Sequence, residues 1–212
     1  MLYVYYFLMC TAFVVSIFHL KDNRVKWISL LLGISMITEL VVEILKTQNQ
    51  SYNFIYHIFI PLEYACIAGL MRQMTDRKRI QVIITYSVIP FFLISALISI
   101  FFVPWNKFPS VHGSIEAVPL VFYSLIVLMQ IKPVEDLPIH QLAVFWFSLA
   151  FLVYFIGTTT FNGVYNSLLA AERKNARQLF DLINSLANYF LYTFIVLGII
   201  CTKWEPKYSA PL

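Results

Sequence analysis

Seven apolar stretches, each about long enough to cross a bilayer, divide this chain of 212 residues. A helix needs about 20 predominantly apolar residues to span the hydrocarbon core. Backbone polar groups in lipid must be bonded within their own segment, so each stretch is predicted to be an α-helix. The predicted fold is therefore all-α, a polytopic membrane bundle of seven transmembrane helices in one domain over 1–212. The expected spans are 2–20, 27–45, 53–72, 80–103, 115–131, 142–162 and 179–201.

The composition agrees with a location in lipid. The chain is 60% hydrophobic and 12% charged, whereas soluble domains average about 45–50% apolar and about 25% charged residues. The first stretch carries neither a basic leader nor a small-x-small cleavage site, so we interpret it as a span and not as a signal peptide. The three cysteines lie far apart without a CxxC spacing, which favours neither a zinc site nor a redox pair.

The positive charges predict the orientation. Ten of the 15 Lys and Arg residues fall on the side of the first, third and fifth connections and the C-terminal tail, and five fall on the other side. By the positive-inside rule the N-terminus is outside and the C-terminus cytoplasmic, as expected for a multi-pass protein of a bacterial inner membrane. The connection 163–178 is expected to be an outer loop with a short surface helix. No basic run with interleaved aromatics is present, so the lipid bilayer, and not nucleic acid, is the expected partner.

Polar residues inside the predicted spans repeat at helical spacing. In the third span Tyr56, His57 and Glu63 share a sector of about 120°, and the second, fifth, sixth and seventh spans carry similar stripes. Lipid penalises such residues, so the stripes are expected to face the interior of the bundle. The candidate ligand-binding residues are Glu39, Tyr56, His57, Glu63, Glu116, Asn162, Asn184 and Asn188.

The depth of these residues predicts a pocket that opens outward and narrows to Glu63. A charge at the bilayer centre costs about 2.5–3.5 kcal/mol, and no Lys or Arg of the sequence falls deep enough to neutralise Glu63. Its partner is then a proton, a cation, a ligand, or the hydroxyl and amide groups of its neighbours. A divalent cation is one alternative, because carboxylates and a histidine can bind it. Its candidate ligands are Glu39, His57, Glu63 and Glu116.

Three other polar residues are expected to lie elsewhere. Tyr5 and Tyr6, near a span end, are interpreted as interface anchors. His112 is expected in a solvated loop.

Five segments carry a resemblance to a known family. They read TELVVE, NFIYHIFIPLEY, SIEAVPLVFYSL, FWFSLAFLVYFIG and LINSLANYFLYTF. Together they are similar to a family of small seven-helix membrane proteins common in bacteria of the Bacteroidota type. Some members precede histidine-kinase modules, so the resemblance implies a sensory input unit with a signalling partner.

Other seven-helix families fit poorly. The last span has no lysine to hold retinal, so retinal is not expected. The four histidines lack the HxxxH spacing of membrane zinc hydrolases, and no G-x-S-x-G nucleophile motif is present. An enzymatic role is therefore not the favoured interpretation.

Three functions remain open. The first is a receptor-like or sensory module that binds a small ligand or cation in the outward pocket and acts on a partner at the cytoplasmic loops. The second is a proton- or cation-coupled transporter or channel, which the lack of an inverted repeat disfavours for a single copy but which a homo-oligomer would permit. The third is an intramembrane metal-dependent enzyme.

Overall fold

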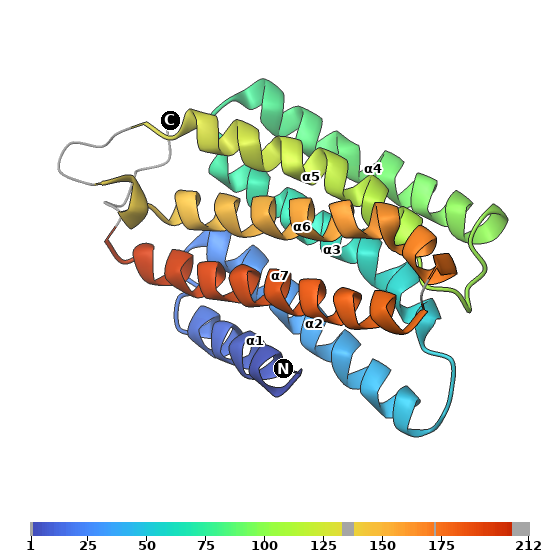
Figure 1. The fold of residues 1–212 in the computed structure, drawn as a ribbon. Coiled ribbons are helices and arrows are strands. Elements are labelled where there is room, and N and C mark those ends of the chain that lie inside the picture. Colours follow the sequence, from blue (N-terminus) through green and yellow to red (C-terminus); the bar gives the residue numbers. More distant parts are fainter. Residues whose placement is uncertain (1, 133–137, 172, 205–212) are drawn as a thin grey trace.

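The computed structural model describes residues 2–132, 138–171 and 173–204, without side-chain positions at 2–3, 160–178 and 180–181. The all-α prediction is confirmed: these residues form seven α-helices and one short 3₁₀ helix (Figure 1). The helices are α1 (Leu2–Ile17), α2 (Asn23–Thr47), α3 (Asn53–Met74), α4 (Lys78–Phe101), α5 (Ser110–Gln130), η1 (Ile139–Gln141), α6 (Ala143–Ala171) and α7 (Arg173–Cys201).

Length and composition make this a multi-pass membrane protein. Five helices are long and apolar enough to cross a membrane, namely α2, α3, α4, α5 and the part of α7 from Leu182 to Cys201. Val4–Ile17 and Ala143–Thr159 are shorter apolar helices. Large apolar side chains also cover the outside of the bundle, such as Ile89, Leu93 and Leu97 along α4. A soluble monomer rarely exposes so extended an apolar surface.

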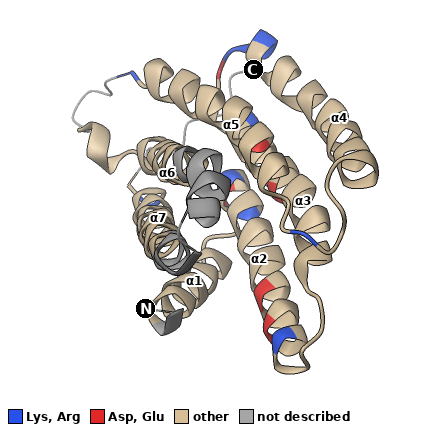
Figure 2. Cartoon of the chain, turned by 45° about the vertical axis from the view of Figure 1, so that its right-hand side comes forward, with Lys and Arg blue, Asp and Glu red and all other residues tan. Residues whose placement is uncertain are grey.

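Six helices form a closed ring, and α4 packs outside it. Contacts run from α1 to α2, α3, α5, α6, α7 and back to α1, while α4 packs on α3 and more lightly on α5 (Figures 1 and 2). Helices α1, α3, α5 and α7 end at one end of the bundle, where α2, α4 and α6 begin (Figure 1). Helices α2, α4 and α6 end at the other end, where α3, α5 and α7 begin, and we call this the entrance end.

The connection 163–178, for which an outer loop with a short surface helix is predicted, is helical over all of its described residues. Helix α6 runs on to Ala171 and α7 begins at Arg173, while Glu172 lies outside the described residues. Hydropathy detects only the part of a helix that suits lipid. The segment contains neither glycine nor proline after Gly163 and is rich in Ala, Leu, Arg and Glu, which are strong helix formers. The helices therefore continue beyond their apolar windows.

Buried apolar side chains form a core in the half of the ring away from the entrance end. Ile67, Leu70 and Met71 of α3 are fully buried there, together with Phe147 of α6 and Ile199 of α7. This core allows close helix contact through glycine. A Cβ atom at Gly198 would overlap the Phe147 ring, and one at Gly69 would lie 2.7 Å from the Trp27 ring.

Helix α2 begins at an anchored cap outside the membrane-spanning segments. The carboxylate of Asp22 accepts a hydrogen bond from the backbone N–H of Arg24 at 2.8 Å and pairs with its guanidinium at 2.6 Å. Partial burial opposes ionisation of Asp22, but the hydrogen bonds and positive charge of Arg24 outweigh that effect and lower its pKa. The helix therefore starts at a capping carboxylate that stays ionised at neutral pH.

Candidate ligand pocket

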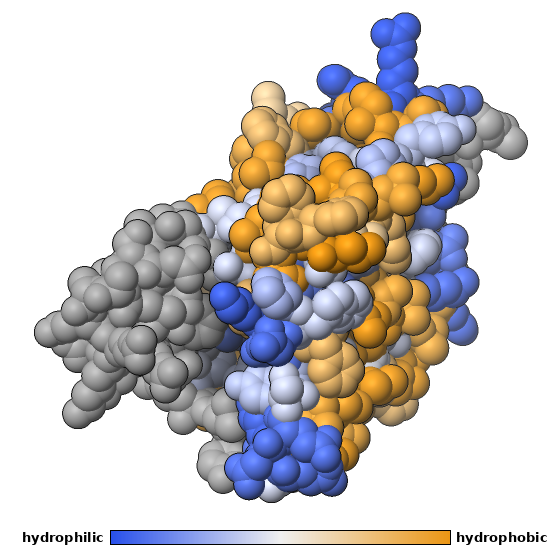
Figure 3. All heavy atoms as spheres, turned by 90° about the vertical axis from the view of Figure 1, so that its right-hand side faces the viewer, coloured by the Kyte–Doolittle hydropathy of each residue, from blue (hydrophilic) through white to orange (hydrophobic). Residues whose placement is uncertain are grey.

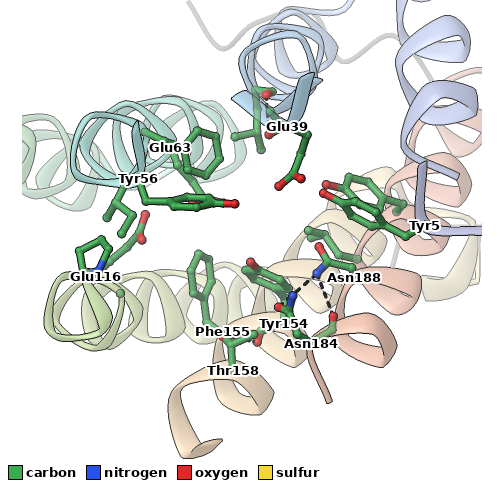
Figure 4. A pocket seen from close by; sticks show the side chains of 18 of the residues that line it. Tyr5, Glu39, Tyr56, Glu63, Glu116, Tyr154, Phe155, Thr158, Asn184 and Asn188 are labelled. Atoms are coloured by element: carbon green, nitrogen blue, oxygen red, sulfur yellow. Dashed lines mark hydrogen bonds between the residues drawn. The ribbon is translucent and has the colours of Figure 1, made fainter. Parts of the chain in front are cut away.

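A cavity of about 220 Å³ lies inside the ring, toward the entrance end. All six ring helices contribute side chains to its wall, and none of the described lining residues belongs to α4. Figure 4 shows several of these side chains converging from different helices on one space. Figure 3, which looks onto the entrance end, shows hydrophilic residues next to hydrophobic ones on this face. The ring therefore separates a polar interior from a surface that suits lipid.

Three glutamates from three helices face this cavity. Glu39 comes from α2, Glu63 from α3 and Glu116 from α5. Glu63 and Glu116 lie close enough for their charges to interact. None of the described lining residues is Lys, Arg or His. The wall is therefore acidic and has no basic side chain of its own to neutralise it.

Glu116 has the least exposed side chain of the three. It is 2% exposed, and its Oε1 atom has no hydrogen-bond partner among the described residues. Leaving a buried carboxylate oxygen without a donor is costly, and most such atoms in proteins are satisfied. Glu116 therefore offers the cavity an acceptor that the fold does not use.

Glu39 is held by tyrosines at the opposite side of the cavity. Tyr6 donates to Glu39 Oε2 at 3.5 Å, and Tyr5 also hydrogen bonds to Glu39. Tyr5 in turn hydrogen bonds to Tyr192 of α7, with ring centroids 5.7 Å apart. These contacts join α1, α2 and α7 around one carboxylate. Figure 4 shows Glu39 and Tyr5 pointing toward one another.

Helical spacing brings the lining residues of each helix to one face. On α3, Tyr56 and Glu63 are seven residues apart, and on α2 Ser35 and Glu39 are four apart. Side chains at these spacings share one side of a helix. On α7 the face continues through Asn184, Asn188, Leu191 and Ile195. Residues of the predicted stripes on α2, α3, α5 and α7 thus contribute to the cavity wall.

The two asparagines on this face of α7 are linked to each other. Asn188 Nδ2 donates to the backbone oxygen of Asn184 at 2.8 Å and to its Oδ1 at 3.3 Å (Figure 4). These side-chain hydrogen bonds link two successive turns of α7. The pair presents amide groups to the cavity in a fixed arrangement.

The structure brings together six of the eight predicted site residues. They are Glu39, Tyr56, Glu63, Glu116, Asn184 and Asn188. His57 does not line the cavity. Asn162 belongs to α6, but its side chain lies outside the described residues.

His57 instead joins a buried network between α3, α4 and α5. Its Nδ1 lies 2.8 Å from Ser99 Oγ, which lies 2.9 Å from His112 Nε2. Its Nε2 donates to the backbone oxygen of Lys107 at 3.1 Å. That bond leaves Nδ1 as the acceptor for the Ser99 hydroxyl, and His112 Nε2 as the donor to Ser99 and to the Ser95 carbonyl at 3.0 Å. His57 therefore fastens α4 to the ring.

The expectation that His112 lies in a solvated loop is wrong. His112 lies in the first turn of α5 and is fully buried. The prediction placed the start of this helix at residue 115, beyond His112, because the preceding residues are polar. The helix begins at Ser110 instead, where a hydrogen-bonded partner on α4 makes the polar side chain acceptable in the interior.

The cavity also uses aromatic residues that the polar stripes do not reveal. Tyr5 was expected at the membrane interface, yet it lines the cavity. Phe59, Tyr154 and Phe155 do so as well. In a chain this rich in apolar residues, an aromatic residue that faces lipid cannot be told from one that faces the interior. The position of Tyr154, four residues before Thr158 on one helix face, is the signal that the sequence offers.

The set Glu39, His57, Glu63 and Glu116 does not form a metal centre in this structure. Within the described part of the chain, no three His, Cys, Asp or Glu side chains are grouped so that they could hold a metal ion. His57 faces the Ser99 network and away from the glutamates. The arrangement can instead bind or orient a group that is positively charged or donates hydrogen bonds.

Comparison with known proteins adds no relative. No protein-family model matches the chain, and neither a curated protein nor a solved structure matches it significantly.

Proposed function

We propose that this protein is a receptor-like or sensory membrane module that binds a small ligand in the ring pocket. The observation that carries the proposal is that all six ring helices share the wall of one polar cavity. A ligand there touches every ring helix at once. Its affinity then depends on how the helices are arranged, so binding favours one arrangement over others.

The apolar core supports the transmitting part of this role. Helices α3, α6 and α7 line the pocket and then pack tightly in the buried core beyond it, through residues such as Ile67, Phe147 and Ile199. Closely packed interiors pass on displacements because they cannot deform continuously. A shift at the pocket would reach the basic connections at the other end of the bundle. A signalling partner would read it there.

We assign the entrance end to the outside of a bacterial inner membrane. Nine of the 14 Lys and Arg residues within the described ranges lie at the opposite end of the bundle, which the positive-inside rule places in the cytoplasm. The resemblance to seven-helix proteins that precede histidine-kinase modules favours the same role. The pocket would then sample the space outside the cell membrane.

Proton- or cation-coupled transport is the second candidate, and the glutamate pair favours it. Glu63 and Glu116 interact inside the bundle, as acidic groups on ion pathways do. The buried side chains of Ile67, Leu70 and Ile199 close the bundle beyond the pocket, so a transport path would need a second conformation. Metal-dependent catalysis has less support, since the described residues contain no group of three metal-binding side chains.

A ligand screen on the purified chain tests the sensory proposal. A true ligand raises the thermal unfolding temperature, and Glu39→Gln and Glu63→Gln abolish that rise. Glu43→Gln is the matched control, because Glu43 lies one turn beyond Glu39 on α2 but pairs with Lys46 outside the pocket. If no compound gives a shift that the two pocket variants abolish, the sensory proposal fails. A flux of protons or cations into proteoliposomes that Glu63→Gln stops would favour transport instead.

A further inference from the structure

We infer that the pocket takes a compact organic cation, with a protonated amine or a quaternary ammonium group as its recognised part. The inference rests on the proposed ligand-binding role and names the class of ligand. Four observations carry it: the charge of the wall, the unused oxygen of Glu116, the aromatic rings and the size of the cavity.

The charge of the wall selects for a positive group. Glu39, Glu63 and Glu116 face the cavity, and its described lining includes no basic side chain. The nearest basic group on α2, Lys46, is occupied elsewhere: it lies 3.7 Å from Glu43 and 5.2 Å from the centre of the Tyr52 ring. An anionic ligand would meet three carboxyl groups, and no basic side chain belongs to the described wall. Electrostatics inside the bundle, where screening is weak, therefore excludes anions and favours cations.

The unused oxygen of Glu116 requires a donor. Glu116 is 2% exposed, it lines the cavity, and its Oε1 has no partner among the described atoms. An ammonium group supplies both a positive charge and N–H donors to such an oxygen. A quaternary ammonium supplies the charge alone. Either group would occupy the space between Glu116 and its neighbour Glu63, where their charges interact.

Aromatic rings form a further part of the wall, as in sites that bind organic cations. Seven of the described lining residues carry aromatic rings: Tyr5, Tyr56, Phe59, Phe108, Tyr154, Phe155 and Tyr192. A cation near the face of such a ring is attracted by its quadrupole, and recognition of quaternary ammonium by aromatic cages uses this effect. A metal ion gains less from such walls because it needs several oxygen ligands at once. Among the described residues, no three His, Cys, Asp or Glu side chains are grouped so that they could hold a metal ion.

The cavity limits the size of the cation. Its volume of about 220 Å³ equals that of about seven liquid water molecules. This is below the usual range of about 300–1,000 Å³ for drug-sized ligands. A small amine or tetramethylammonium fits, whereas a long polyamine or a nucleoside does not. The same ammonium chemistry can come from a free amine or from a phospholipid headgroup.

The test compares four probes of similar size on the full chain in detergent. They are tetramethylammonium, n-butylammonium, neutral tert-butanol and anionic butyrate, with Na⁺, Mg²⁺ and Ca²⁺ as inorganic controls. The inference predicts that the two organic cations raise the unfolding temperature in a saturable way and that the other compounds do not. Glu39→Gln and Glu116→Gln are each expected to weaken cation binding by about tenfold or more. Glu43→Gln is expected to bind like the unaltered protein.

The outcomes separate this inference from the proposed function. Saturable binding of tert-butanol or butyrate that the pocket variants abolish would contradict the organic-cation class of ligand. It would still support the proposed function of the cavity as a ligand-binding pocket. Binding of inorganic ions alone, with the same sensitivity, would overturn it in favour of an ion site. No binding that responds to Glu39→Gln or Glu116→Gln would overturn both.

A lipid arm identifies the source of the ammonium. If tetramethylammonium binds equally in phosphatidylglycerol and phosphatidylethanolamine nanodiscs, the natural ligand is a free amine. If phosphatidylethanolamine, which carries an ammonium headgroup, blocks tetramethylammonium while phosphatidylglycerol does not, the headgroup is the ligand. Both results support the ammonium class.

Discussion

Glu63 on α3 and Glu116 on α5 face the same cavity, and their charges interact within the bundle. Two carboxylates so placed need a proton or a cation between them. The described residues provide neither a basic side chain at the wall nor a donor for Glu116 Oε1. We therefore expect the pair to bind a proton or a cation that enters the pocket.

A double-mutant cycle tests the contact between these glutamates. Glu63→Gln and Glu116→Gln each remove one of two interacting groups, so their effects on the free energy of unfolding should not add. We expect a coupling energy of about 0.5–3 kcal/mol. The pair Glu63→Gln and Glu43→Gln serves as the control and should be additive, because Glu43 lies outside the pocket. Additivity of the first pair would show that the two carboxylates do not meet.

The network around His57 should stabilise the fold. Ser99→Ala removes the hydroxyl that bonds to both His57 and His112, so we expect a loss of about 1–3 kcal/mol in the free energy of unfolding. Ser124→Ala is the matched control. Its buried hydroxyl bonds only to Leu120 O of its own helix at 2.8 Å, and its removal should cost clearly less. Equal losses in thermal unfolding would argue against a bracing role for the network.

Gly198 should be required by the close packing of α6 on α7. Gly198→Ala places a methyl group against the Phe147 ring, and we expect destabilisation of about 1–3 kcal/mol. Gly157→Ala is the control, because its Cβ would lie at an ordinary 4.0 Å from Ala187 Cβ. That variant should be neutral or gain up to about 1 kcal/mol from helix propensity. Thermal unfolding of both variants under one condition makes the comparison, and a tolerated Gly198→Ala would contradict this packing.

The cap at Asp22 predicts a pH dependence. Its pKa is lower in the folded state than in the unfolded chain, so its stabilising effect is present above the unfolded value of about 3.9 and fades as the pH falls through the folded value. At neutral pH, Asp22→Ala should lower the free energy of unfolding by about 1 kcal/mol. The difference from the unaltered protein should shrink below about pH 4. A difference that stayed constant from pH 7 to pH 3 would exclude an ionised cap.

The helices and most of the polar wall follow from the sequence because lipid imposes simple rules. Apolar length predicts a span, and polar residues at helical spacing predict an inward face. Glu39, Glu63 and Asn188 lie in the cavity for this reason. These rules do not predict helix outside the apolar segments. They therefore miss the helical residues 163–171 and 173–178, which are not apolar enough to be detected by hydropathy.

The remaining features depend on which helices are neighbours. His57 and Glu63 share one stripe on α3, yet His57 turns to Ser99 of α4 and Glu63 to the cavity. Only the position of α4 outside the ring decides between these two sides. Tyr5 likewise meets Glu39 because α1 closes the ring between α2 and α7. No local pattern in the sequence contains that information.

The central claim is that the ring encloses a water-accessible pocket that opens to the outside. The most direct measurement is the labelling of a cysteine introduced at Thr158, on the pocket wall, in a Cys10→Ala background that removes the exposed native thiol and keeps the buried Cys66 and Cys201. Ile156→Cys is the control. Ile156 lies two positions away on the same helix, does not line the pocket, and is exposed on the apolar outer surface of the bundle, where lipid would shield it from a polar reagent. A cationic, membrane-impermeant methanethiosulfonate added outside intact cells should label Thr158→Cys and leave Ile156→Cys unlabelled. An unreactive Thr158→Cys, or one labelled only from the cytoplasmic side, would contradict the account.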